Sequence, residues 1–83
     1  MQKWEFCRAH YLTKLNGGVE AYIVRFTTEG REAEAIEEDE EMCVSEKLEL
    51  TLARMGQEGW EIVGFVQFLE PVAFTYMLKR AIE

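Results

Sequence analysis

Few residues in this 83-residue chain are of a type that could do chemistry: it has one histidine, His10, and two cysteines, Cys7 and Cys43. Nucleophilic catalysis needs a nucleophile and its base within hydrogen-bond reach. In an extended strand, residues three apart point to opposite faces, so Cys7 and His10 are not expected to form such a pair. A zinc site needs four ligands, and these three residues are dispersed. The sequence therefore predicts a non-enzymatic protein with no catalytic residues, no metal site and no cofactor.

A second group of side chains is cationic and aromatic. If Asn16 and Gly17 form a two-residue type I′ turn, the numbers of two residues that face each other on the flanking strands add up to 33. Arg8 then lies opposite Arg25. Like charges directly opposite are unfavourable unless acids or a bound anion neutralise them. With His10 and Trp4, these arginines form a candidate binding site for a small, nucleotide-like anion at a subunit interface.

Two alternatives to this anion site stay open. A looser turn would shift the register and separate the arginines. The arginines could also pair with carboxylates. Candidate acids are Glu5, Glu20, Glu61 and the acidic segment; aromatic side chains near the arginines are Trp4, Phe6 and Tyr22.

Acidic residues are concentrated in one segment. Residues 29–41 hold eight acids and one base, which accounts for the whole net charge of −7. The segment lacks the alternating oxygen ligands and central glycine of a calcium loop. We therefore expect a solvated acidic loop over residues 29–44, whose deletion over 30–41 leaves the fold unchanged; an alternative is that it binds a basic partner protein. The acidity of the chain also argues against nucleic acid as a partner.

The rest of the chain predicts four strands and one helix. Leu48, Leu52 and Met55 recur at helical spacing after Ser45, a plausible N-cap. The expected strands cover Lys3–Leu12, Val19–Thr28, Trp60–Leu69 and Val72–Ala81, and the expected helix covers Glu46–Glu58, with a turn near Glu70-Pro71.

The end of that helix has a specific signature. Glycine adopts the left-handed conformation at C′ without a steric penalty, so we place Gly59 there; the alternative is that Gly56 is the cap and a short extra turn follows it. Met55 is then C3 and Trp60 is C″, the pair whose contact closes a Schellman cap.

These elements make one small α+β domain over residues 1–83: a β-β-α-β-β chain whose four-stranded, mainly antiparallel sheet carries the helix on one face. Both faces of the second hairpin are largely apolar, the second face of the first hairpin is mixed, and one helix covers only one face. We therefore expect the second face to be buried by another copy, in a homodimer or higher homo-oligomer. No apolar run approaches the length needed to span a membrane, so a cytoplasmic location and no membrane partner are expected.

Three stretches carry a family resemblance: the pattern Leu52-x-x-Met55-Gly56-x-Glu58-Gly59-Trp60-Glu61-x-Val63, the N-terminal Lys3-Trp4-Glu5-Phe6 and the closing Leu78-Lys79-Arg80. Together they resemble the domain of unknown function 4177 family of small bacterial and phage proteins. The resemblance covers both ends and the helix–strand junction. It implies a compact α+β domain that often self-associates, and it offers no catalytic residues to carry over. The acidic insertion, and the lack of a glycine-rich turn between the last two strands, depart from the family pattern. The leading hypothesis is a self-associating interaction module, and the alternative is a protein that binds or sequesters a small anion.

Overall fold

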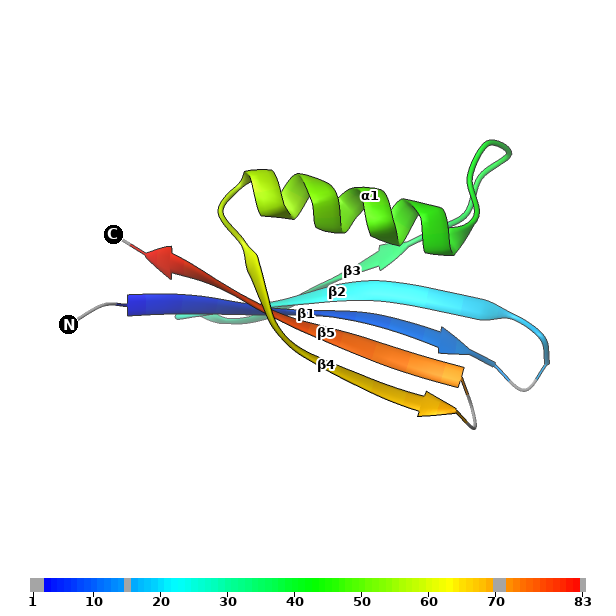
Figure 1. Ribbon diagram of the computed structural model, residues 1–83, viewed down its shortest axis with the longest axis horizontal. Coiled ribbons are helices and arrows are strands. Elements are labelled where there is room, and N and C mark those ends of the chain that lie inside the picture. Colours follow the sequence, from blue (N-terminus) through cyan, green and yellow to red (C-terminus); the bar gives the residue numbers. More distant parts are fainter. Residues whose placement is uncertain (1–2, 15, 70–71, 83) are drawn as a thin grey trace.

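A computed structural model describes residues 3–14, 16–69 and 72–82 (Figure 1). Five strands form one antiparallel sheet in the order β3-β2-β1-β5-β4. The elements follow the chain as β1 Lys3–Thr13, β2 Val19–Thr27, β3 Gly30–Ile36, α1 Val44–Gln57, β4 Glu61–Leu69 and β5 Val72–Ile82. The α+β class is confirmed, but the prediction of four strands is wrong by one. The predicted turn at residues 70–71 lies outside the described residues.

The additional strand, β3, comes from the segment expected to be an acidic loop. Thr27 pairs with Gly30 across a tight turn, and β3 then runs antiparallel to β2 up to the pair Ala21 and Ile36. Glu32 and Glu34 alternate with small side chains, so the strand can place its acids on one face. The expectation of a loop over residues 29–44 is therefore wrong for residues 30–36.

The turn between β1 and β2 sets a different register from the predicted one. Lys14 N–H donates to the Gly18 carbonyl at 2.7 Å, and Gly17 N–H donates to the Lys14 carbonyl at 3.0 Å. Three residues therefore separate Lys14 from Gly18, and only glycine has a positive φ in the described chain, as at Gly17 (83°). Such a geometry is typical of a three-residue hairpin loop and excludes a type I′ turn with Asn16 at positive φ.

The changed turn shifts β2 by one residue relative to the prediction. The numbers of facing residues on β1 and β2 add up to 32, so Arg8 lies opposite Val24 and Cys7 lies opposite Arg25. A one-residue shift moves every side chain of a strand to the other face of the sheet. The predicted Arg8–Arg25 pair is therefore wrong, because the two arginines lie on opposite faces.

The start of α1 is held by the loop before it. Cys43, and not Ser45, is the N-cap, and its side chain makes no capping hydrogen bond. The Asp39 carboxylate accepts hydrogen bonds from the N–H groups of Glu41 and Met42 and forms an ion pair with Lys47 in the first turns of the helix. The Lys47 ammonium and these two backbone hydrogen bonds hold the pKa of Asp39 at about 2, below its ordinary value of 3.8.

The end of α1 confirms the predicted Schellman cap. Trp60 N–H donates to the Met55 carbonyl at 3.0 Å, and Gly59 N–H donates to the Gly56 carbonyl at 3.2 Å. Gly59 has a φ of 98°, in the left-handed region. Met55 and Trp60 are both buried, so the cap is anchored in the core.

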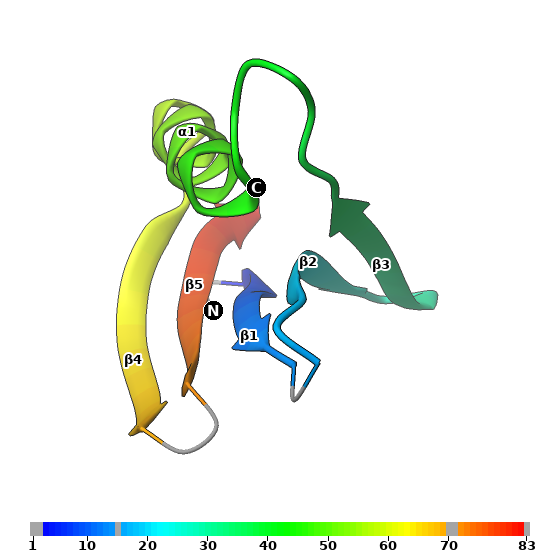
Figure 2. The same ribbon diagram turned by 90° about the vertical axis from the view of Figure 1, so that its right-hand side faces the viewer.

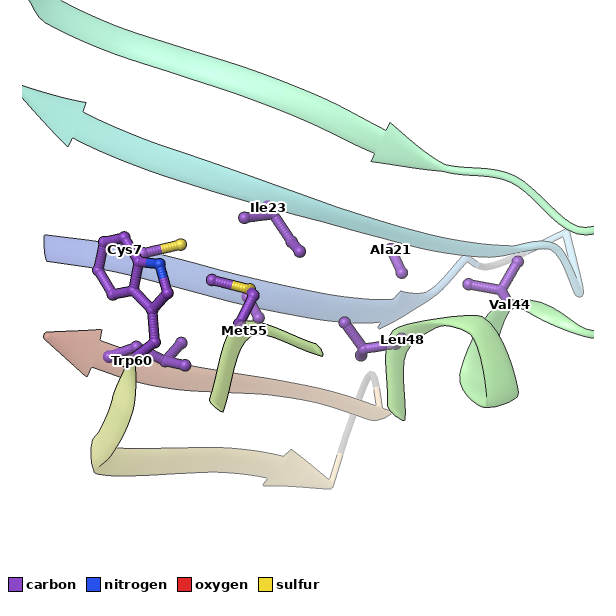
Figure 3. Close-up of a cluster of buried hydrophobic side chains, with 9 residues drawn as sticks. Cys7, Ala21, Ile23, Val44, Leu48, Met55 and Trp60 are labelled. Carbon is purple, nitrogen blue, oxygen red and sulfur yellow. The ribbon is translucent and has the colours of Figure 1, made fainter. Parts of the chain in front are cut away.

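The core lies between α1 and one face of the sheet (Figures 1 and 2). Figure 3 shows how side chains from the helix, the sheet and the junction before β4 meet there. The buried members are Cys7, Ala9, Ala21, Ile23, Val44, Leu48, Met55, Trp60 and Leu78. We call the sheet face turned away from α1 the open face.

Candidate functional site

Alternate residues of β1 and β2 meet on the open face and form a basic cleft. Arg8, His10 and Phe6 have the same parity on β1, and they lie opposite Val24, Tyr22 and Phe26 on β2. On the next strand, Arg31 of β3 is directly opposite Phe26. The cleft has a volume of about 270 Å³ and is lined by Arg8, His10, Tyr22, Val24, Phe26 and Arg31.

Two aromatic rings of β2 contact the side chains of Arg8 and His10 in the cleft. The Arg8 guanidinium lies over the Phe26 ring, with its carbon 4.9 Å from the ring centroid. His10 stacks on Tyr22 with the ring centroids 4.7 Å apart. Val24, which is 2% exposed, is the buried apolar member of the lining. Phe26 therefore contacts the Arg8 guanidinium and is the cross-strand partner of Arg31.

The positive charges of both arginines in the cleft affect the His10 imidazole. Burial, followed by the positive charges of Arg8 and Arg31, lowers the pKa of His10 below its ordinary value of 6.5. Its Nδ1 shares a hydrogen bond with the Thr75 hydroxyl of β5 at 2.9 Å. The imidazole is therefore neutral at pH 7, and the field around it is positive.

A separate group on the open face is apolar. Its side chains come from β1, β4 and β5, and each is 39–60% exposed. We call this group the apolar patch: Phe6, Val63, Val66, Phe68 and Met77. Val63 reaches this face because the β4–β5 register shifts between Ile62 and Gly64. A hollow of about 380 Å³ joins the patch to the basic cleft through the shared residues Arg8 and Phe26.

The structure brings together two of the four residues predicted for the anion site. Arg8 and His10 both line the basic cleft. Arg25 lies on the helix side of the sheet, where it forms an ion pair with Glu34 at 3.0 Å. Trp4 is on the open face but lines a neighbouring hollow, with the Lys79 ammonium 4.1 Å from its ring centroid.

Arg31 is the residue that the sequence analysis missed. It belongs to the segment interpreted as a loop, so no strand register was assigned to it. The signal that could have found it is the period-two alternation of Arg31, Ala33 and Ala35 with Glu32 and Glu34.

The sheet keeps the two candidate reactive groups apart. Cys7 is 1% exposed on the helix side, and burial raises the pKa of its thiol despite the nearby positive charge of Arg25. His10 is on the opposite face, so these two residues do not form a nucleophile–base pair. Among residues 3–14, 16–69 and 72–82, no group of three or more Cys, His, Asp or Glu side chains converges on a metal position.

Comparisons of the chain with protein-family models, curated proteins and solved structures found no match. The resemblance to the domain of unknown function 4177 family therefore stays a prediction. Within the described part of the chain, α1 is the one helix, and it is not long and apolar enough to span a membrane.

Proposed function

We propose that this chain is a non-enzymatic, self-associating interaction module whose apolar patch is covered by a second copy. The observation that carries this proposal is the amount of surface that one copy exposes. A compact monomer of 9.7 kDa is expected to expose about 5,100 Å², whereas this chain exposes 6241 Å². The excess of about 1,100 Å² is larger than the ~800 Å² that each partner contributes to an interface of standard size.

The shape of the chain supports the same proposal. Its radius of gyration is 13.6 Å, compared with about 12 Å for a compact domain of this length. The cause is visible in Figure 2: a single helix covers one face of a five-stranded sheet and leaves the other face uncovered. A second layer on the open face would bury the apolar side chains that the helix leaves exposed.

The charge distribution favours a second copy as the occupant of the patch. Two copies with a net charge of −7 each repel one another, so a stable contact needs an uncharged surface. Residues 62–69 of β4 contain no charged side chain, and neither do residues 71–78. A two-fold arrangement would place these two uncharged segments against their own copies, which is the usual geometry of homodimers.

A cytoplasmic location is part of the proposal. Cys7 and Cys43 are both free thiols, and thiols stay reduced in that compartment.

The experiment is sedimentation velocity at tens of micromolar protein, with Phe68→Glu as the test variant. Phe68 is 60% exposed in the apolar patch, so a glutamate there is tolerated in one copy but would be buried between two. We expect the unmodified chain to sediment as a dimer or larger, and the variant to sediment as a 9.7 kDa monomer.

Leu50→Glu is the matched control. Leu50 is 55% exposed on α1 and is not part of the open face, so its replacement should leave the assembly intact. A monomeric unmodified chain, or equal dissociation by both variants, would contradict the proposal. Circular dichroism checks that each variant is folded.

A further inference from the structure

The arginines of the basic cleft lack the carboxylate partners that five other basic residues of the described chain have. Ion pairs to carboxylates hold Lys14, Arg25, Lys47, Lys79 and Arg80. Within the part of the chain that the structure describes, neither Arg8 nor Arg31 has an ion pair, although the chain carries 16 acids. Two guanidiniums without carboxylate partners that line the same cleft are an arrangement that a bound anion would stabilise.

Arg8 and Arg31 line the same cleft of the open face. Arg8 stacks on Phe26, and Arg31 is directly opposite Phe26 on the next strand. Burial, and then the positive charges of both Arg8 and Arg31, lower the pKa of His10 in this cleft. The other side chains in contact with His10 are the Tyr22 ring on β2 and the Thr75 hydroxyl on β5.

The chemistry of the cleft selects the kind of anion. One guanidinium can satisfy a carboxylate through two parallel hydrogen bonds. Two guanidiniums and an imidazole need an anion with more oxygen atoms and more charge, which a phosphate supplies. The exposed part of Phe26, which lines the basic cleft itself, offers apolar surface for a ring attached to that phosphate.

We propose that the basic cleft is a binding site for a small phosphate-bearing molecule, with the phosphate held between Arg8 and Arg31 and an attached ring against Phe26. This inference goes beyond self-association, because all three residues come from one copy. It also replaces the site predicted from sequence, in which Arg25 stood in the place of Arg31.

The test is isothermal titration calorimetry with three probes: inorganic phosphate, adenosine monophosphate and adenosine. We expect adenosine monophosphate to bind most tightly, inorganic phosphate more weakly, and adenosine not measurably. Binding of phosphate and of the nucleotide with equal affinity would show that the cleft takes the free ion only, and would overturn the role of Phe26.

Arg31→Gln and Arg8→Gln are the test variants, and each should weaken nucleotide binding by about tenfold or more, because each removes a charged hydrogen-bond donor. Arg25→Gln is the matched control, since it removes an arginine from the same sheet but from the helix side, where it pairs with Glu34. Equal losses in all three variants would overturn the proposal, because they would indicate a general charge effect.

A second readout follows the His10 imidazole by nuclear magnetic resonance. Bound phosphate should raise the pKa of His10 in the unmodified chain and have less effect in Arg31→Gln. The monomeric Phe68→Glu variant should still bind the nucleotide, which separates failure of this site from failure of self-association. Saturable binding to an oligonucleotide but not to the mononucleotide would overturn the small-molecule site in favour of a nucleic-acid surface.

Discussion

At the scale of single residues, charge compensation separates the three arginines of β1, β2 and β3. Arg25 has Glu34 at 3.0 Å on the helix side of the sheet. Arg8 lies over the Phe26 ring and, among the described residues, has no carboxylate partner, while Arg31 is the cross-strand partner of Phe26 on the edge strand. Arg8 and Arg31 therefore give the open face a local positive charge in a chain that is acidic overall.

His10 makes this local charge measurable as a pH dependence of stability. Because folding lowers the pKa of His10, the unfolded chain binds more protons than the folded chain just below the ordinary value of 6.5. The free energy of unfolding should therefore fall as the pH is lowered from about 7.5 to about 5.5. Urea denaturation across this range measures the change.

Two variants assign the effect to the cleft. His10→Gln should flatten the pH dependence between those limits, since the titrating group is gone. Arg31→Gln should reduce it in part, because one of the repelling charges is removed. Asp39 titrates at a pKa of about 2 and does not interfere in this window. An unchanged slope in His10→Gln would contradict the assignment.

At the scale of elements, the two edge strands differ in character. β3 carries Arg31, Glu32 and Glu34, and such charges discourage unwanted pairing at a sheet edge. β4 carries the charge of Glu61 at its start and is uncharged from Ile62 onward. The same sheet thus has one protected edge and one edge that adjoins the apolar patch, which matches the side where a second copy is proposed.

The end of α1 gives a paired prediction on backbone conformation. Gly59→Ala should lower the free energy of unfolding by about 1–2 kcal/mol, because a Cβ is strained in the left-handed conformation. That Cβ would also lie 3.4 Å from the Arg80 Cδ. Thermal or urea denaturation measures the loss.

Gly56→Ala is the control one turn earlier. Gly56 lies inside the helix with no atom within 4 Å of an added Cβ, so alanine should raise stability by roughly 0.5–1 kcal/mol. Destabilisation of similar size in both variants would mean that the junction is limited by packing and not by the left-handed residue.

At the scale of the whole molecule, the helix covers one face of the five-stranded sheet and leaves the other face exposed. The 6241 Å² surface and the 13.6 Å radius of gyration both follow from a layer that is covered on one side only. The net charge of −7 opposes association of copies, while the apolar patch favours it.

The repulsion between acidic copies and the attraction between apolar patches predict that self-association depends on salt concentration. Raising NaCl from ~0.05 M to ~0.5 M should strengthen self-association, because salt screens the repulsion between acidic copies more than it affects apolar contact. Nucleotide binding to the basic cleft should weaken over the same range, because that contact is an attraction between opposite charges. Sedimentation velocity and calorimetry measure the two effects, and dissociation of the assembly by salt would point to an interface made of ion pairs.

The sequence alone determined the features whose cause is local. The end of the helix follows from Met55, Gly59 and Trp60, because a left-handed residue and its hydrophobic contact are specified within six residues. The α+β class follows from helical and alternating spacing of apolar residues. The uncovered apolar face was likewise predictable, because apolar residues lie on both faces of the second hairpin and one helix covers only one face of the sheet.

Only the tertiary structure decided which side chains share a face. Strand pairing is non-local, and the hairpin loop between Lys14 and Gly18 is one residue longer than a type I′ turn, which sends Arg25 to the helix side. The acidic segment becomes β3 because β2 offers it an unpaired edge, and that pairing brings Arg31 to Arg8 and His10. A site made by neighbouring strands thus depends on register, and register is a property of the folded sheet.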